Sequence, residues 1–96
     1  MKNSEIPRNI IGPTLRRLRN QRGWTQKKLA EMLQLRGWSA SRETVARLEA
    51  QLRWVSDFEL WFLADTLGVG TSELYPQYGC RKLVQQFIDQ FEYSPG

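Results

Sequence analysis

The sequence contains no histidine and only one cysteine, Cys80. Without histidine, the chain lacks both the commonest general base and the commonest protein metal ligand. A single cysteine cannot form an internal disulfide, and with no histidine it cannot complete a zinc site of usual ligand count. Cysteine usage of this kind favours a reducing compartment, and we expect a cytoplasmic protein.

Other chemical and targeting signals are also missing. No apolar run reaches the length of about 18 residues that a membrane-spanning helix needs. The polar start MKNSEIPRN lacks the apolar core of a signal peptide. There is no glycine-rich phosphate loop, and no pair of acidic residues stands out in an apolar stretch. We therefore expect no enzymatic activity, no cofactor and no metal site.

What the chain does have is an uneven distribution of charge. Its 96 residues suffice for one small domain. Residues 1–55 hold twelve basic and four acidic residues, a net charge of +8, whereas residues 56–96 hold two basic and six acidic residues, a net charge of −4. A basic half beside an acidic half predicts one surface suited to a polyanion. Uneven charge also occurs in proteins that bind no polyanion. The helix patterns must therefore decide whether this chain has such a binding surface.

Two short helices are predicted before residue 36. Pro13 suits the first turn of one helix, and Gly23 suits the position just after its end. Thr25 is expected to cap the second helix, and Gly37 to end it. The spacing of their inner faces gives seven positions: Leu15, Leu18, Arg19, Arg22, Leu29, Ala30 and Leu33.

The start of the second helix is a candidate anion site. Its first backbone N–H groups have no partner within the helix, and the helix dipole favours negative charge there. Gln26 and Lys27 bring side-chain donors to the same place. The expected guest is a phosphate group.

Residues 41–51 predict a third helix with two unlike faces. One face is mostly apolar, and the other is short, polar and basic. The first comprises Val45, Leu48, Glu49 and Leu52, and the second Glu43, Ala46, Arg47 and Ala50, with Arg42 near the helix start. Such a helix can pack on a core and enter a groove about 12 Å wide, but an ordinary surface helix has the same pattern.

Two inner faces carry a charged residue, Arg19 on the first helix and Glu49 on the third. A buried charge needs a partner. We predict that these two residues pair across the core and that the pair is structural.

The fold class predicted is all-α. Ser56 and Glu59 form a capping box at the start of a fourth helix, which Gly68 ends, and residues 71–74 form a short closing turn. We expect a flexible arm at 1–9, a compact bundle of four to five short helices at 10–75, and an extra C-terminal amphipathic helix and tail at 76–96.

The C-terminal segment carries a separate apolar stripe at helical spacing: Leu83, Val84, Phe87, Ile88 and Phe91. Because the bundle is complete by residue 75, this stripe must be buried elsewhere. It can dock on Phe58, Trp61 and Phe62 of its own chain, or on a second chain. We favour dimerisation.

These segments, in this order, resemble a helix-turn-helix domain of the Cro and phage-repressor (XRE-type) family. Residues 15–26, LRRLRNQRGWTQ, followed by Leu29, Ala30 and Leu33, resemble the family's opening. Residues 41–49, SRETVARLE, resemble its recognition helix, and residues 63–69, LADTLGV, with 72–74, SEL, resemble its closing helices. The resemblance covers residues 10–75.

The resemblance implies a bacterial or phage-encoded protein whose third helix lies in the major groove of DNA. By position, the base-reading residues are Arg42, Glu43, Thr44 and Arg47, and the phosphate-contacting residues are Thr25, Gln26 and Lys27, with Arg53 after the third helix as a further candidate. The Arg19–Glu49 pair matches a core ion pair known in relatives.

One departure is the connection before the third helix. The segment from Leu33 to Ser41 is several residues longer than the family pattern, so either the second helix continues past Leu35 or the turn bulges. Arg36 in this segment is a further DNA-contact candidate.

Two functions follow from these observations. The first is a sequence-specific double-stranded DNA-binding transcriptional regulator, repressor-like and homodimeric. The second is a protein-interaction module, such as an antitoxin or a coactivator-like helix-turn-helix protein. Its partner would bind the C-terminal stripe.

Overall fold

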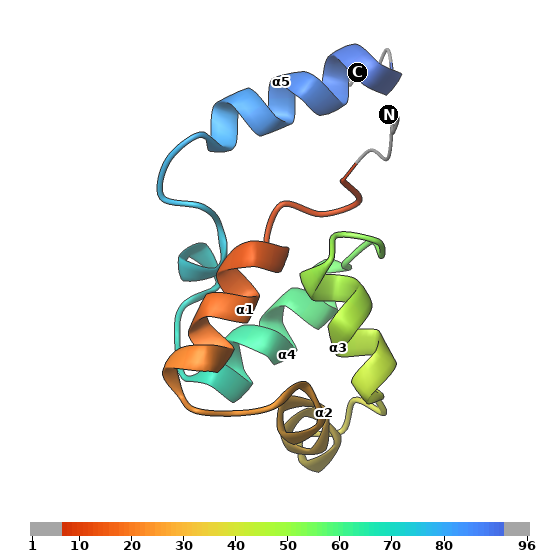
Figure 1. Cartoon of the computed structure of the whole chain (residues 1–96), viewed down its shortest axis with the longest axis vertical. Coiled ribbons are helices and arrows are strands. Elements are labelled where there is room, and N and C mark those ends of the chain that lie inside the picture. Colours follow the sequence, from red (N-terminus) through yellow and green to blue (C-terminus); the bar gives the residue numbers. More distant parts are fainter. Residues whose placement is uncertain (1–6, 92–96) are drawn as a thin grey trace.

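The structure is built entirely of helices within the residues that it describes. The computed structural model describes residues 7–91. Its elements are α1 (Gly12–Gln21), α2 (Gln26–Leu35), α3 (Arg42–Glu49), α4 (Asp57–Leu67), the 3-10 turn η1 (Thr71–Leu74) and α5 (Cys80–Phe91) (Figure 1). The all-α bundle with an additional C-terminal helix is therefore confirmed. Residues 1–6 of the predicted arm and the tail after residue 91 lie outside the described part.

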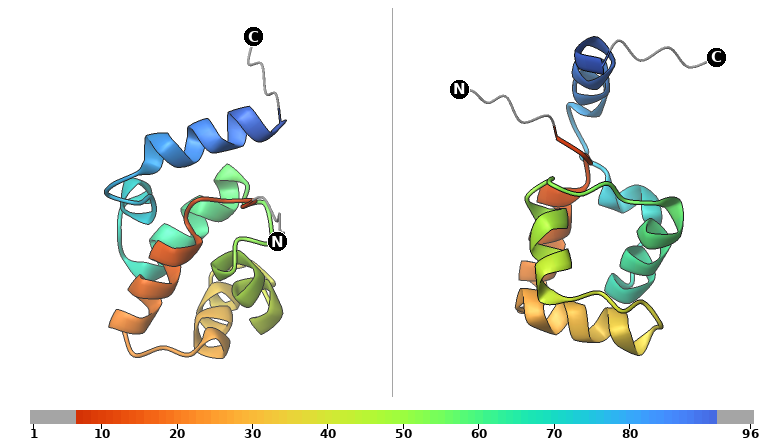
Figure 2. Two further views of the ribbon diagram at one scale, coloured as in Figure 1. Left: turned by 45° about the horizontal axis from the view of Figure 1, so that its top comes forward. Right: turned by 90° about the vertical axis from the view of Figure 1, so that its right-hand side faces the viewer.

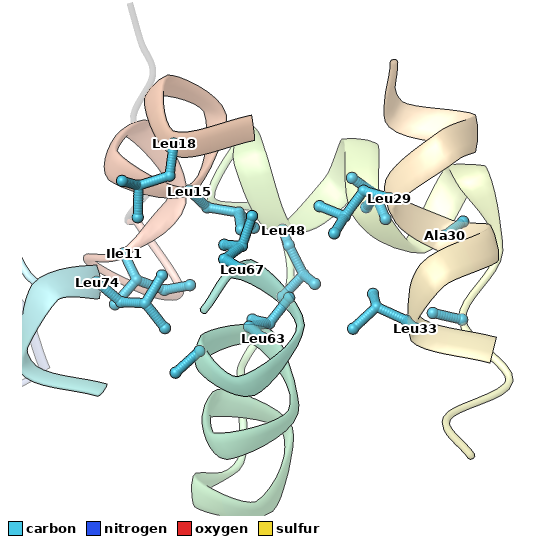
Figure 3. Packing of buried hydrophobic residues seen from close by; sticks show 13 residues of the cluster. Ile11, Leu15, Leu18, Leu29, Ala30, Leu33, Leu48, Leu63, Leu67 and Leu74 are labelled. Atoms are coloured by element: carbon cyan, nitrogen blue, oxygen red, sulfur yellow. The ribbon is translucent and has the colours of Figure 1, made fainter. Parts of the chain in front are cut away.

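The core lies where α1, α2, α3 and α4 meet. Figure 3 shows leucines from each of these helices directed toward a common centre, among them Leu15, Leu33, Leu48 and Leu63. All four are fully buried. Burying a leucine side chain stabilises a fold by about 1.5–3 kcal/mol. The core thus fixes α2 and α3 relative to each other.

The predicted C-terminal ends of α1 and α2 are confirmed. Gly23 and Gly37 both have a positive φ, which favours glycine, directly after the C-caps of α1 and α2. At the end of α2, the Trp38 amide donates to the Leu33 carbonyl at 3.1 Å, so the helix stops at Leu35. The extra length before α3 is therefore loop rather than helix.

The connection between α2 and α3 is held at both ends. Gln34 Nε2 donates to the Ala40 carbonyl at 2.7 Å, and Ala40 is buried. Trp38 packs on Phe62 of α4, with ring centroids 6.3 Å apart. The long loop thus leads into α3 from a fixed position.

The bundle begins earlier than the predicted boundary at residue 10. The Arg8 amide donates to the Gln51 carbonyl at 2.9 Å, and Asn9 is only 8% exposed. Residues 8 and 9 are therefore part of the folded domain. No local sequence pattern indicates this, because the side-chain contacts of Asn9 join residues 39 and 44 positions apart.

α5 lies at one end of the bundle, and the segment before α1 runs between it and the other helices (Figures 1 and 2). Its Phe87 meets Trp54 edge to face, with centroids 6.1 Å apart. Docking on Phe58, Trp61 and Phe62 is therefore not what the structure shows. Phe58 is 78% exposed, and Phe62 packs with Trp38 and Trp61 instead.

Candidate nucleic-acid interface

α3 has the two faces that its spacing predicts over residues 42–49, but the expectation for Leu52 is wrong, because the helix ends at Glu49 and Leu52 is 43% exposed. Ser41 caps the helix by accepting a hydrogen bond from the Thr44 amide at 3.1 Å. Val45, Leu48 and Glu49 are buried, whereas Arg42, Glu43 and Arg47 are exposed. Eight residues make a helix about 12 Å long. The exposed face therefore presents two guanidinium groups and one carboxylate over a short length.

Thr44 differs from the other candidate base-reading residues. It is half-buried, and its hydroxyl lies 3.1 Å from the Ser41 hydroxyl. The Thr44 hydroxyl therefore already has a hydrogen-bond partner, the Ser41 hydroxyl, within the helix cap. Of the four candidates, Thr44 is the least open to an outside ligand.

The start of α2 forms as predicted. The Thr25 hydroxyl accepts from the Lys28 amide at 2.9 Å, and Lys27 is exposed. The amides of the first turn precede any intrahelical acceptor and point outward along the helix axis. Gln26 is half-buried, and its Nε2 donates to Glu49 Oε1 at 3.0 Å. Its backbone N–H rather than its side chain is thus the better donor to an anion.

Arg19 and Glu49 are in direct contact at the centre of this region. Arg19 Nε donates to Glu49 Oε2 at 2.5 Å, and Arg19 Nη2 donates to Oε1 at 3.0 Å. Arg16 approaches the same carboxylate at 3.4 Å, and Arg19 Nη1 donates to the Trp24 carbonyl. With the bond from Gln26, this single carboxylate joins α1, the start of α2 and the end of α3.

The protonation of Glu49 follows from these contacts. Burial raises the pKa of the carboxyl group, but the hydrogen bonds from Arg19 and Gln26 outweigh burial and hold the pKa below its usual range. The Glu49 hydrogen bond likewise raises the pKa of Arg19. Both groups therefore stay charged at neutral pH.

Arg36 and Arg53 are engaged within the chain. Arg36 Nη1 lies 2.6 Å from Asp65 Oδ2 on α4. Arg53 donates two bonds of 3.0 Å to Glu59, and its guanidinium lies 5.7 Å from the centre of the Trp38 ring. A phosphate would have to compete with these carboxylates for either arginine.

A second feature lies under α5. A groove of about 580 Å³ opens between this helix and the bundle, and its walls include Asn9, Trp54, Val55, Leu83 and Phe87.

Within residues 7–91, no group of three or more His, Cys, Asp or Glu residues could hold a metal ion. Across the same residues, no helix is both long enough and apolar enough to cross a bilayer.

A short capped helix, an irregular turn and a second helix with an exposed basic face, packed in a small α-helical bundle, define the class of helix-turn-helix domains. The helix-turn-helix family model of the Cro and phage-repressor (XRE) type matches residues 15–74, and the chain belongs to this family. It thus carries a DNA-binding fold of the kind found in transcription regulators. No curated protein and no solved structure matches the chain.

Proposed function

We propose that the chain is a sequence-specific, double-stranded DNA-binding transcription regulator of the repressor type. It acts in the cytoplasm as a homodimer. The observation that carries this proposal is the Glu49 carboxylate, which joins the start of α2 to the end of α3. An anion site and an exposed basic helix are thereby held in one rigid frame.

The exposed face of α3 supplies the base contacts. Arg42 and Arg47 can each donate two bonds to guanine O6 and N7, and Glu43 can accept from cytosine N4. Thr44 contributes once its hydroxyl turns from Ser41. Thr25, Gln26 and Lys27 bind a phosphate at the start of α2, while Arg36 and Arg53 reach the backbone only by leaving Asp65 and Glu59.

The homodimer places two copies of α3 in successive major grooves. Half-sites then lie about 34 Å apart, one turn of DNA. The stripe on α5 is the proposed contact: Val84 is 42% exposed, and Leu83, Phe87 and Ile88 are half-buried. Phe91 belongs to the same stripe by sequence, although its side chain lies outside the described part. A second copy covers what the bundle leaves open.

The alternative is a protein-interaction module, and one observation favours it. Phe58 and Trp61 lie one turn apart on α4 and are 78% and 56% exposed. Exposed aromatic residues of this kind are enriched in protein interfaces. A partner on α4 would leave α3 available for DNA.

The test is selection of bound duplexes from a random DNA pool at about 150 mM salt, the physiological ionic strength. The proposal predicts a palindromic motif with half-sites one turn apart. Selection of a single asymmetric half-site would support sequence-specific DNA binding and would contradict the proposed homodimer. No enrichment over random duplexes would overturn the proposed function in favour of the protein-interaction module.

Arg42 and Arg47 are expected to carry specificity. Arg42→Ala or Arg47→Ala should cost about 1–3 kcal/mol in operator binding and relax the preference at one base position. Lys27→Ala should instead weaken binding to operator and random DNA alike. Fluorescence anisotropy with an operator duplex and a random duplex measures the ratio of the two affinities, the operator-to-random ratio.

Arg17→Ala is the matched control. Arg17 is exposed on α1 and lies beside η1, so the variant removes the same charge away from α3. Its operator-to-random ratio should equal that of the parent. An Arg47→Ala protein with the parental ratio would show that Arg47 reads no base.

A further inference from the structure

Asn9 uses its whole side-chain amide inside the folded domain. Nδ2 donates to the Leu48 carbonyl at 3.1 Å and to the Arg53 carbonyl at 2.9 Å. Oδ1 accepts from the amides of Ile11 and Gly12, at 3.2 and 2.9 Å. An amide offers two donors and one acceptor oxygen. One side chain therefore joins the start of α1, the last turn of α3 and the loop that follows α3.

Gln51 completes the contact from the opposite side. Its Nε2 donates to the Asn9 carbonyl at 2.9 Å, and its own carbonyl accepts from the Arg8 amide at 2.9 Å. Among the described residues, it is the single non-glycine residue with a positive φ, at 62°. Glycine usually occupies that position after a helix. The structure keeps a glutamine there, and the bonds to residues 8 and 9 hold it.

We propose that Asn9 is a positioning residue for the recognition helix, and that it sets base specificity by fixing the C-terminal end of α3. This inference rests on the proposed function. Leu48 belongs to the last turn of α3, and its carbonyl accepts from Asn9 Nδ2 and from the Gln51 amide, both at 3.1 Å. Asn9 therefore holds α3 itself, and it does so from outside the helix-turn-helix segment.

The expected consequence is a loss of specificity larger than the loss of non-specific affinity. Arg42 lies at the far end of a helix about 12 Å long, so a tilt at the C-terminal end displaces its guanidinium. Hydrogen bonds to base edges tolerate only a few tenths of an ångström. The start of α2 is held separately by its own Thr25 cap and by Leu29 in the core, so phosphate binding persists.

Asn9→Asp is the most direct variant. The carboxylate keeps an acceptor for the Ile11 and Gly12 amides, but it replaces the Nδ2 donor with an oxygen facing two carbonyls. The operator-to-random binding ratio should fall by about tenfold, comparable to losing one base contact. Binding to random DNA should stay close to the parental value. Circular dichroism defines a temperature at which every variant is fully folded.

Two further variants separate positioning from stability. Val69→Ala shortens a half-buried side chain after α4, so it lowers stability without touching α3, and it should keep the parental ratio. Gln51→Gly suits the positive φ and folds, but it removes the bond to the Asn9 carbonyl. It should lower the ratio by less than Asn9→Asp does.

The wild-type chain separates the two possible failures. If it selects no motif from the random pool, the proposed function fails and this inference fails with it. If it selects a motif, and both Asn9→Asp and Gln51→Gly keep the parental ratio, only the role of Asn9 is overturned. An equal loss in Val69→Ala would also overturn it, because general destabilisation would then explain the result.

Discussion

Replacing Glu49 by glutamine is expected to lower the free energy of unfolding by about 3–5 kcal/mol, the range seen when one partner of a buried ion pair is removed. The Glu49 side chain is 0% exposed, and that of Arg19 is 10% exposed. Glutamine still offers one acceptor oxygen, but it leaves the guanidinium without a counter-charge. Urea denaturation at pH 7 gives the free energy directly.

Two controls isolate the charge. Arg16 also reaches Glu49, but its side chain is 54% exposed and the distance is 3.4 Å, so Arg16→Ala should cost less than about 1 kcal/mol. The double variant Arg19→Met with Glu49→Leu removes both charges and should recover much of the loss. A double variant no more stable than Glu49→Gln would show that the hydrogen-bond geometry, not the unpaired charge, dominates.

The pH dependence of stability gives an independent check of the same pair. The pKa of Glu49 is lower in the folded state than in the unfolded chain. In an unfolded chain the pKa of a glutamate is about 4.3. The stabilisation is therefore complete above about pH 4.3 and is lost as the pH falls through the folded pKa. Glu49→Gln should flatten this decline.

A part of the decline should remain in Glu49→Gln. Arg53 donates to Glu59 and lowers the pKa of that carboxyl group as well, in the same direction. If the unfolding free energy of Glu49→Gln decreased as steeply as the parent's when the pH is lowered, Glu49 would contribute nothing to the loss of stability in acid.

The Arg19–Glu49 contact could be predicted from the sequence, whereas the Asn9 contacts could not. Two charges on inner helical faces conflict with burial, and pairing is the simplest resolution. Asn9 has no such signature, because a polar residue before a helix reads as terminus or loop. Its partners are carbonyl groups, which every residue carries, so only the fold reveals which ones it meets.

The same limit applies to the side chains around the candidate site. The sequence located the exposed face of α3 because helical period and capping are local properties. It did not show that Arg53 pairs with Glu59, or that Phe87 meets Trp54. Those contacts depend on the path of the loop between α3 and α4 and on where α5 lies against it, and spacing along one helix encodes neither. Part of the candidate phosphate-contact set is therefore already engaged within the chain.

Gly12 gives the second large effect, because its backbone lies directly against the end of α3. A Cβ atom at this position would lie 2.5 Å from the Leu48 carbonyl oxygen and 2.7 Å from that of Glu49. Both are backbone atoms and cannot rotate away. Gly12→Ala should therefore lower the free energy of unfolding by about 3 kcal/mol, the upper part of the usual range for overpacking.

Gly70→Ala is the matched control for this substitution. A Cβ at Gly70 would lie 3.5 Å from Glu73 Oε2, an ordinary contact, and the residue does not have a positive φ. Both alanines restrict the unfolded chain equally, which alone stabilises a protein by about 0.4–1 kcal/mol. The difference between the two variants in urea denaturation thus measures the clash. Equal stabilities would mean that α1 can retreat from α3 without cost, and that the end of the recognition helix is less tightly held than Gly12 and Asn9 indicate.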